Sequence, residues 1–72
     1  MKVRTLLKHM RNSVDEVEIW SRAGQLSGGK DILETFRGCY AECKVDTFHI
    51  YKDEKDRSVL EIAIKDTGRA TL

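Results

Sequence analysis

The feature that most constrains this chain is a period-two alternation of apolar residues in two nearby stretches. Phe48 and Ile50 form the first set, and Leu60, Ile62 and Ile64 form the second. A period of two is typical of a strand with one buried face. Matching the two faces predicts a hairpin with Ile50 opposite Leu60 and Phe48 opposite Ile62, closed by an odd-numbered loop of about three or five residues.

An earlier stretch predicts a second hairpin by the same reasoning. Val17 and Ile19 alternate with glutamates, and residues 25–28 form a short return strand after a two-residue turn at Ala23-Gly24 or a slightly longer loop, since Ala23 suits a mirror-image turn poorly. This register places Leu26 on the same face as Val17 and Ile19, so the first hairpin also has one apolar face.

Two short amphipathic helices are predicted from apolar residues spaced three and four apart. The first ends near Asn12, and the second covers 30–37 and ends at Gly38 in a left-handed conformation. Both are too short to be stable alone, so we expect them to pack against the sheet. The side chains expected to face inward are Val3, Leu6, Leu7, Met10, Ile32, Leu33 and Phe36.

The order helix, strand, strand, helix, strand, strand predicts an α+β fold. We expect a four-stranded antiparallel sheet of two hairpins with both short helices on one face. A chain of 72 residues holds one domain, assigned to residues 1–66, with 67–72 as a flexible C-terminal tail. The expected sheet core is Val17, Ile19, Leu26, Phe48, Ile50, Leu60, Ile62 and Ile64.

Charge, hydropathy and cysteine content exclude several classes of protein. Thirteen basic and twelve acidic residues leave a net charge of +1, too balanced for nucleic-acid binding by the whole chain. The longest apolar runs are far shorter than the roughly 20 residues that cross a bilayer. Cys39 and Cys43 are too few for a disulfide-stapled secreted fold and lack histidines at ligand spacing. We therefore predict a cytoplasmic protein without a metal or other cofactor.

Catalytic chemistry has little support in the sequence. The serines lack a nucleophile motif, and the cysteines have no nearby histidine to activate them. His49 and Glu61 are expected to share the outer sheet face, where a polar residue is ordinary. The prediction is a protein that is not an enzyme and has no small-molecule substrate.

The outer sheet face carries the first candidate binding surface. The strand alternation directs Trp20, His49, Tyr51 and Val59 away from the core, toward this face. Tryptophan and tyrosine are enriched in protein interfaces because they bury a large area at low entropy cost. These residues therefore predict a surface for a protein partner or for self-association. Scattered surface aromatics without a role are the alternative reading.

The first helix carries the second candidate surface. Arg4, Lys8 and Arg11 lie at helical spacing and precede the first acidic residue, Asp15. Such a basic face predicts possible contact with nucleic-acid phosphates, in an accessory or regulatory role. A solvated helix face is the simpler interpretation of the same charges.

A family resemblance spans residues 3–65. The opening helix Thr5-Leu6-Leu7-Lys8-His9-Met10, the strand Val17-Glu18-Ile19-Trp20 and the closing hairpin follow one another in a characteristic order. That hairpin joins Phe48-His49-Ile50-Tyr51 to Leu60-Glu61-Ile62-Ala63-Ile64. The layout resembles small accessory proteins encoded by phages and mobile elements of Firmicutes, most of which have no assigned activity. The resemblance implies a cytoplasmic binding role directed at the host or the element, and it assigns no functional residues.

Overall fold

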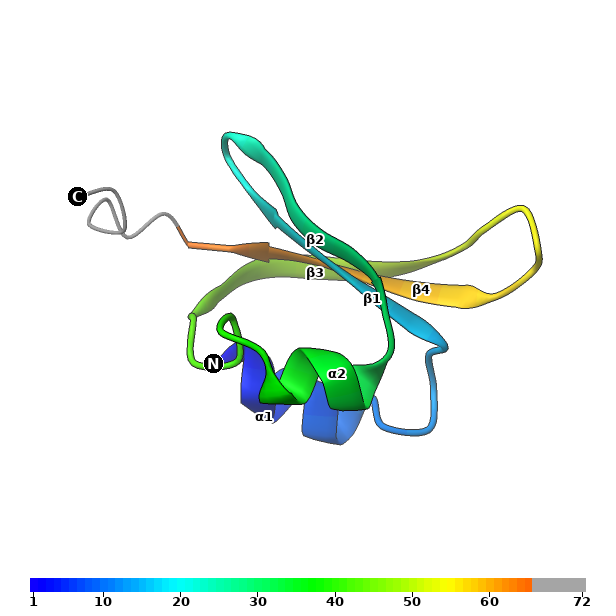
Figure 1. Ribbon diagram of the computed structural model, residues 1–72, viewed down its shortest axis with the longest axis horizontal. Coiled ribbons are helices and arrows are strands. Elements are labelled where there is room, and N and C mark those ends of the chain that lie inside the picture. Colours follow the sequence, from blue (N-terminus) through cyan, green and yellow to red (C-terminus); the bar gives the residue numbers. More distant parts are fainter. Residues whose placement is uncertain (66–72) are drawn as a thin grey trace.

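The computed structural model describes residues 1–65 and has the predicted α+β element order. The elements are α1 (Val3–His9), β1 (Glu16–Ser21), β2 (Gly24–Lys30), α2 (Ile32–Arg37), β3 (Val45–Lys52) and β4 (Ser58–Ile64). Both helices lie on the same side of the sheet (Figure 1). The tail predicted at 67–72 lies outside the described residues.

The sheet is mixed, so the prediction of a fully antiparallel sheet is wrong in one pairing. The strand order is β2-β1-β4-β3, and the central neighbours β1 and β4 run parallel. Val17 pairs with Leu60 and Ile19 with Ile62, so aliphatic side chains from the two hairpins lie next to each other at the centre of the sheet. This arrangement puts the glycine-rich β2 and the strand β3 at the two edges, where less of each strand is covered.

The second hairpin has the predicted register. Ile50 is opposite Leu60 and Phe48 is opposite Ile62. The loop between the strands covers five residues, 53–57, in agreement with the odd number expected. Asp53 stabilises this loop because its Oδ1 accepts hydrogen bonds from the backbone amides of Lys55 and Arg57, each at 2.9 Å.

The first hairpin differs from the prediction in its turn. Ser21 pairs with Gly24, so the two loop residues are Arg22 and Ala23 rather than Ala23 and Gly24. Gly24 has a φ of +135°, a conformation that glycine adopts without strain. Irregular pairing between β1 and β2 then leaves Leu26 exposed, and its assignment to the core is wrong.

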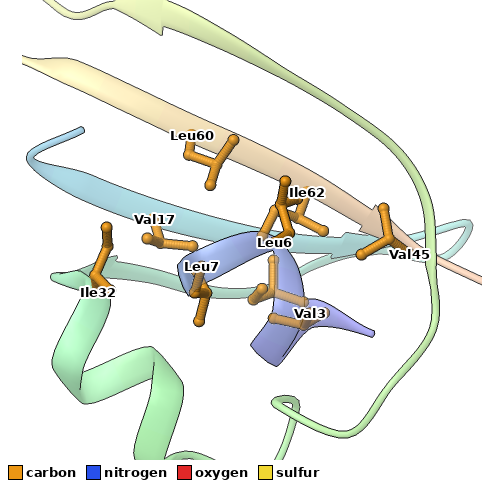
Figure 2. Packing of buried hydrophobic residues seen from close by; sticks show 9 residues of the cluster. Val3, Leu6, Leu7, Val17, Ile32, Val45, Leu60 and Ile62 are labelled. Carbon is orange, nitrogen blue, oxygen red and sulfur yellow. The ribbon is translucent and has the colours of Figure 1, made fainter. Parts of the chain in front are cut away.

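The core is concentrated over the two central strands. Val17, Ile19, Leu60 and Ile62 are buried against residues of α1, α2 and the start of β3 (Figure 2). Phe48 and Ile50 lie on the same face but are 40% and 44% exposed, so their assignment to the core is wrong. The buried cluster is formed by Val3, Leu6, Leu7, Val17, Ile19, Ile32, Val45, Leu60 and Ile62.

The helices begin in different ways. Helix α2 begins with a capping box in which Asp31 accepts from the Glu34 amide and Glu34 accepts from the Asp31 amide. Helix α1 has no capping side chain, because the amides of Val3 and Arg4 donate to carbonyls of the 41–43 loop. This long-range contact fixes the start of α1 and has no local sequence signal.

Two predictions about α2 are wrong. Gly38 has a φ of −83° and an extended conformation instead of a left-handed one, and its amide donates to the Thr35 carbonyl at the end of the helix. Leu33 is 58% exposed and does not face the sheet core. With only six residues, α2 turns Ile32 and Thr35 to the interior and leaves Leu33 at the rim.

Candidate functional site

The predicted outer surface exists as a face of three neighbouring strands. Its middle row consists of Glu18 on β1, Glu61 on β4 and His49 on β3. One flanking row contains Glu16, Val59 and Tyr51, and the other contains Trp20, Ala63 and Thr47. The structure therefore places the predicted residues Trp20, His49, Tyr51 and Val59 on the face expected for them.

The two aromatic residues of this face are bound to one glutamate. The Tyr51 hydroxyl donates to Glu18 Oε2 at 2.7 Å, and Trp20 Nε1 donates to Glu18 Oε1 at 3.1 Å. The hydrogen bond to Glu18 raises the pKa of Tyr51 to about 12. Trp20 is half-buried and Tyr51 is exposed. The indole N–H and the phenol hydroxyl therefore each donate a hydrogen bond to the Glu18 carboxylate, while parts of both rings stay accessible to solvent.

The burial of Val59 corrects the predicted surface. It points to the outer face, but only 1% of it is exposed. Tyr51 lies directly opposite Val59 on β3, and its hydroxyl reaches Glu18 two strands away. The tyrosine side chain therefore crosses β4 at this position, so Val59 is a buried packing residue and offers no contact area to a partner.

The remaining carboxylates of the face also have partners. His49 Nε2 lies 2.8 Å from Glu61 Oε1, and Arg57 Nη2 lies 2.8 Å from Glu16 Oε1. Glu18 and Glu61 are opposite each other in the parallel ladder, where like charges repel, and each carboxylate has a polar partner: Tyr51 and Trp20 for Glu18, and His49 for Glu61. The His49–Glu61 pair lies on an open sheet face with a largely exposed imidazole.

The sequence missed a second surface, which lies along edge strand β3. Phe48 and Ile50 expose apolar side chains on the helix side of the sheet, and His49 and Tyr51 lie on the other side. A signal for this edge position was present, because Asp46 and Lys52 flank the apolar pair. Charged residues at the margins of a strand are one way in which proteins protect an open sheet edge.

Only every second residue of the regular part of β3 turns its backbone amide and carbonyl toward β4. The Asp53 amide donates to the Arg57 carbonyl at 3.0 Å, which makes residues 53 and 57 a hydrogen-bonded antiparallel pair. Because bonded and non-bonded pairs alternate, His49 and Tyr51 turn their backbone groups toward β4. Phe48, Ile50 and Lys52 consequently turn theirs outward, where the strand order places no neighbour among the described residues.

The predicted phosphate-contact residues do not act as one group. Arg4 Nε binds Glu42 Oε2 at 2.7 Å, and its guanidinium carbon lies 4.7 Å from the centre of the Phe36 ring. Hydrogen bonds from Lys2 and Arg4 lower the pKa of Glu42. Lys8 and Arg11 have no ion pair within residues 1–65 and border a groove of about 220 Å³ between the helices. That groove is otherwise lined by Leu7, Ile32, Leu33 and Phe36.

Cysteine chemistry and metal binding have no assembled site in the described part of the chain. Cys39 is exposed and Cys43 is half-buried, and both are free thiols. Burial raises the pKa of the Cys43 thiol, which favours its neutral form. Within residues 1–65, no cluster of three or more histidine, cysteine or acidic side chains could hold a metal ion.

Comparison with known proteins leaves the family resemblance as a prediction. No family model, curated protein or solved structure matches this chain. Across residues 1–65, no helix has both the length and the apolar character needed to cross a membrane.

Proposed function

We propose that this protein is a non-enzymatic interaction module that binds proteins by adding a strand to the β3 edge. The observation that supports the proposal most directly is the outward backbone of Phe48, Ile50 and Lys52 beside two exposed apolar side chains. Strand addition uses main-chain hydrogen bonds for affinity and alternating side chains for specificity.

Residues of the outer face also support this role. A strand that pairs with β3 lies beside His49 and Tyr51 on one face, and beside Phe48 and Ile50 on the other. The predicted interaction residues His49 and Tyr51 therefore remain part of the proposed surface. Trp20 lies on β1, two strands away from this edge, and takes the role of a flanking residue.

A synthetic peptide with the sequence of residues 45–53 tests strand addition. Labelled with a fluorophore and titrated with the whole chain, the peptide should show a saturable rise in fluorescence anisotropy. N-methylation of the peptide amides at Phe48 and Ile50 should abolish binding in the antiparallel register that sets these side chains against Phe48 and Ile50 of the chain, because it removes the donors that face the chain. N-methylation at His49 and Tyr51 is the matched control and should preserve binding, because those amides face away.

Two results would contradict the proposed function. The unmodified peptide could fail to bind, which would show that the β3 edge does not accept a strand. Alternatively, both N-methylated peptides could bind equally well, which would show that side chains alone are recognised and that the outward backbone is irrelevant.

A further inference from the structure

We propose that the groove between α1 and α2 binds a small carboxylate with an apolar body of about six to ten carbon atoms, such as a medium-chain alkyl carboxylate. The carboxylate is bound without chemical change. This inference does not rest on the proposed function, because the residues that line the groove come from α1, the turn after it and α2, rather than from β3. Three observations support it: the lining of the groove, its size and the charge along its rim.

The lining of the groove is apolar on both sides. The groove forms where α1 and α2, which lie on the same side of the sheet, do not close over each other (Figure 1). Leu7 and Ile32 are buried at its base, Phe36 is half-buried, and Leu33 is 58% exposed. An apolar ligand is therefore stabilised by removing these side chains from water.

The volume of the groove, about 220 Å³, limits the size of its occupant. A cavity of about 150 Å³ holds benzene, and drug-sized ligands occupy pockets of about 300–1,000 Å³. The groove therefore suits a ligand of about ten non-hydrogen atoms. A partner helix presents its apolar anchors over about two turns and needs a longer groove than helices of seven and six residues provide.

The charge along the rim selects an anion. Lys8 and Arg11 line the groove on the α1 side, and both are exposed. Neither has an ion pair within residues 1–65, whereas Lys2 and Arg4 both pair with Glu42. The positive charge that stays uncompensated in this part of the chain therefore lies beside the groove. A carboxylate suits it, because its two oxygens accept hydrogen bonds from lysine and arginine.

The acidic residues of α2 do not compensate the rim. Asp31 and Glu34 each accept the other's backbone amide in the capping box. Glu34 also lies on the opposite side of α2 from the three residues that line the groove, because a helix has 3.6 residues per turn. A carboxylate at the α1 rim therefore meets two cations, while its apolar body lies against the groove lining.

Titration of the isotope-labelled chain with octanoate, followed by backbone amide NMR shifts, tests the proposal. The shifts should centre on Lys8, Leu33 and Phe36 and should saturate with a Kd of about 1 mM or tighter. Hexanoate should bind about fivefold more weakly, because it buries two fewer methylenes. Octylammonium has the same chain and the opposite charge, so it should bind at least about tenfold more weakly than octanoate.

Variants of the rim separate charge from packing. Lys8→Gln and Arg11→Gln should each weaken octanoate binding about threefold, and together about tenfold. Arg22→Gln is the matched control: it removes the same charge at the exposed turn after β1 and should leave the affinity unchanged. Leu33→Ala should weaken octanoate binding about threefold while keeping the preference for octanoate over octylammonium, because it removes only apolar contact.

Several outcomes would overturn the inference. Octanoate shifts could fail to saturate or could centre outside the groove. Octylammonium could bind as tightly as octanoate, or the Lys8 and Arg11 variants could bind octanoate as tightly as the native chain. The chain could also ignore octanoate yet bind phosphatidylglycerol vesicles or duplex DNA through Lys8 and Arg11, which would assign these cations to a different partner. Binding of the 45–53 peptide is measured separately, so each proposal can fail without the other.

Discussion

Strands β3 and β4 are the two arms of one hairpin and have the same alternation, yet their apolar residues have different surroundings. Leu60 and Ile62 are fully buried, whereas their cross-strand partners Ile50 and Phe48 are partly exposed. The helices cover the central strands β1 and β4, while β3 lies at the edge. Alternation therefore determines which way a side chain points, and position in the sheet determines whether it is buried.

The largest expected difference between the arms comes from truncating one cross-strand pair. Leu60→Ala should lower the free energy of unfolding by about 2–5 kcal/mol, because it opens a cavity in the core. Ile50→Ala should cost under about 1 kcal/mol, because its side chain is partly in solvent. Urea unfolding followed by Trp20 fluorescence, at low protein concentration, measures both. Equal losses would contradict the contrast between β3 and β4.

A hydroxyl introduced into each strand of the hairpin should give a smaller difference between β3 and β4 in the free energy of unfolding. Val59→Thr adds a polar group at a buried position without a partner and should cost about 1–3 kcal/mol. Ile50→Thr is the control on β3, where water can hydrate the new hydroxyl, and should cost under about 1 kcal/mol. The same unfolding assay applies. A Val59→Thr protein of native stability would show that this residue is a surface residue, as its outward direction alone suggests.

The smallest expected effect on stability concerns Tyr51, the side chain of β3 that reaches Glu18 on β1. The pKa of Tyr51 is raised to about 12 from its ordinary value of 10.0, because its hydroxyl donates to Glu18. The folded state therefore keeps a proton that the unfolded state loses, so this contribution is complete below pH 10.0 and is lost as pH rises through about 12. In a Tyr40→Phe background, tyrosinate absorbance should report the raised midpoint, and Tyr51→Phe should flatten the alkaline loss of stability. A midpoint at the ordinary tyrosine value would contradict the Tyr51–Glu18 bond.

The sequence predicted the features that depend on local order. The pairing of Ile50 with Leu60 follows from alternation and loop parity, and the order of helices and strands follows from spacing. The parallel pairing of β1 with β4 could not be predicted, because alternation does not specify which strands become neighbours. The start of α1 at Val3 depends on carbonyls about forty residues away, which no local signal indicates.

The candidate site was predicted in part for the same reason. The outward direction of Trp20, His49 and Tyr51 follows from alternation alone. The burial of Val59 depends on Tyr51 reaching Glu18 across β4, and the pairing of Arg4 depends on Glu42 in a distant loop. The exposure of Phe48 and Ile50 depends on β3 being an edge strand, which is a property of the whole sheet.

Amide hydrogen exchange along β3 tests the central claim most directly. The amides of His49 and Tyr51 should be protected at every concentration, because they face β4. Those of Phe48, Ile50 and Lys52 should exchange quickly in the free protein and become protected when the 45–53 peptide is added and pairs with the edge. Rapid exchange of these three amides at every concentration, with or without the 45–53 peptide, would contradict the account of β3 as a strand-adding edge.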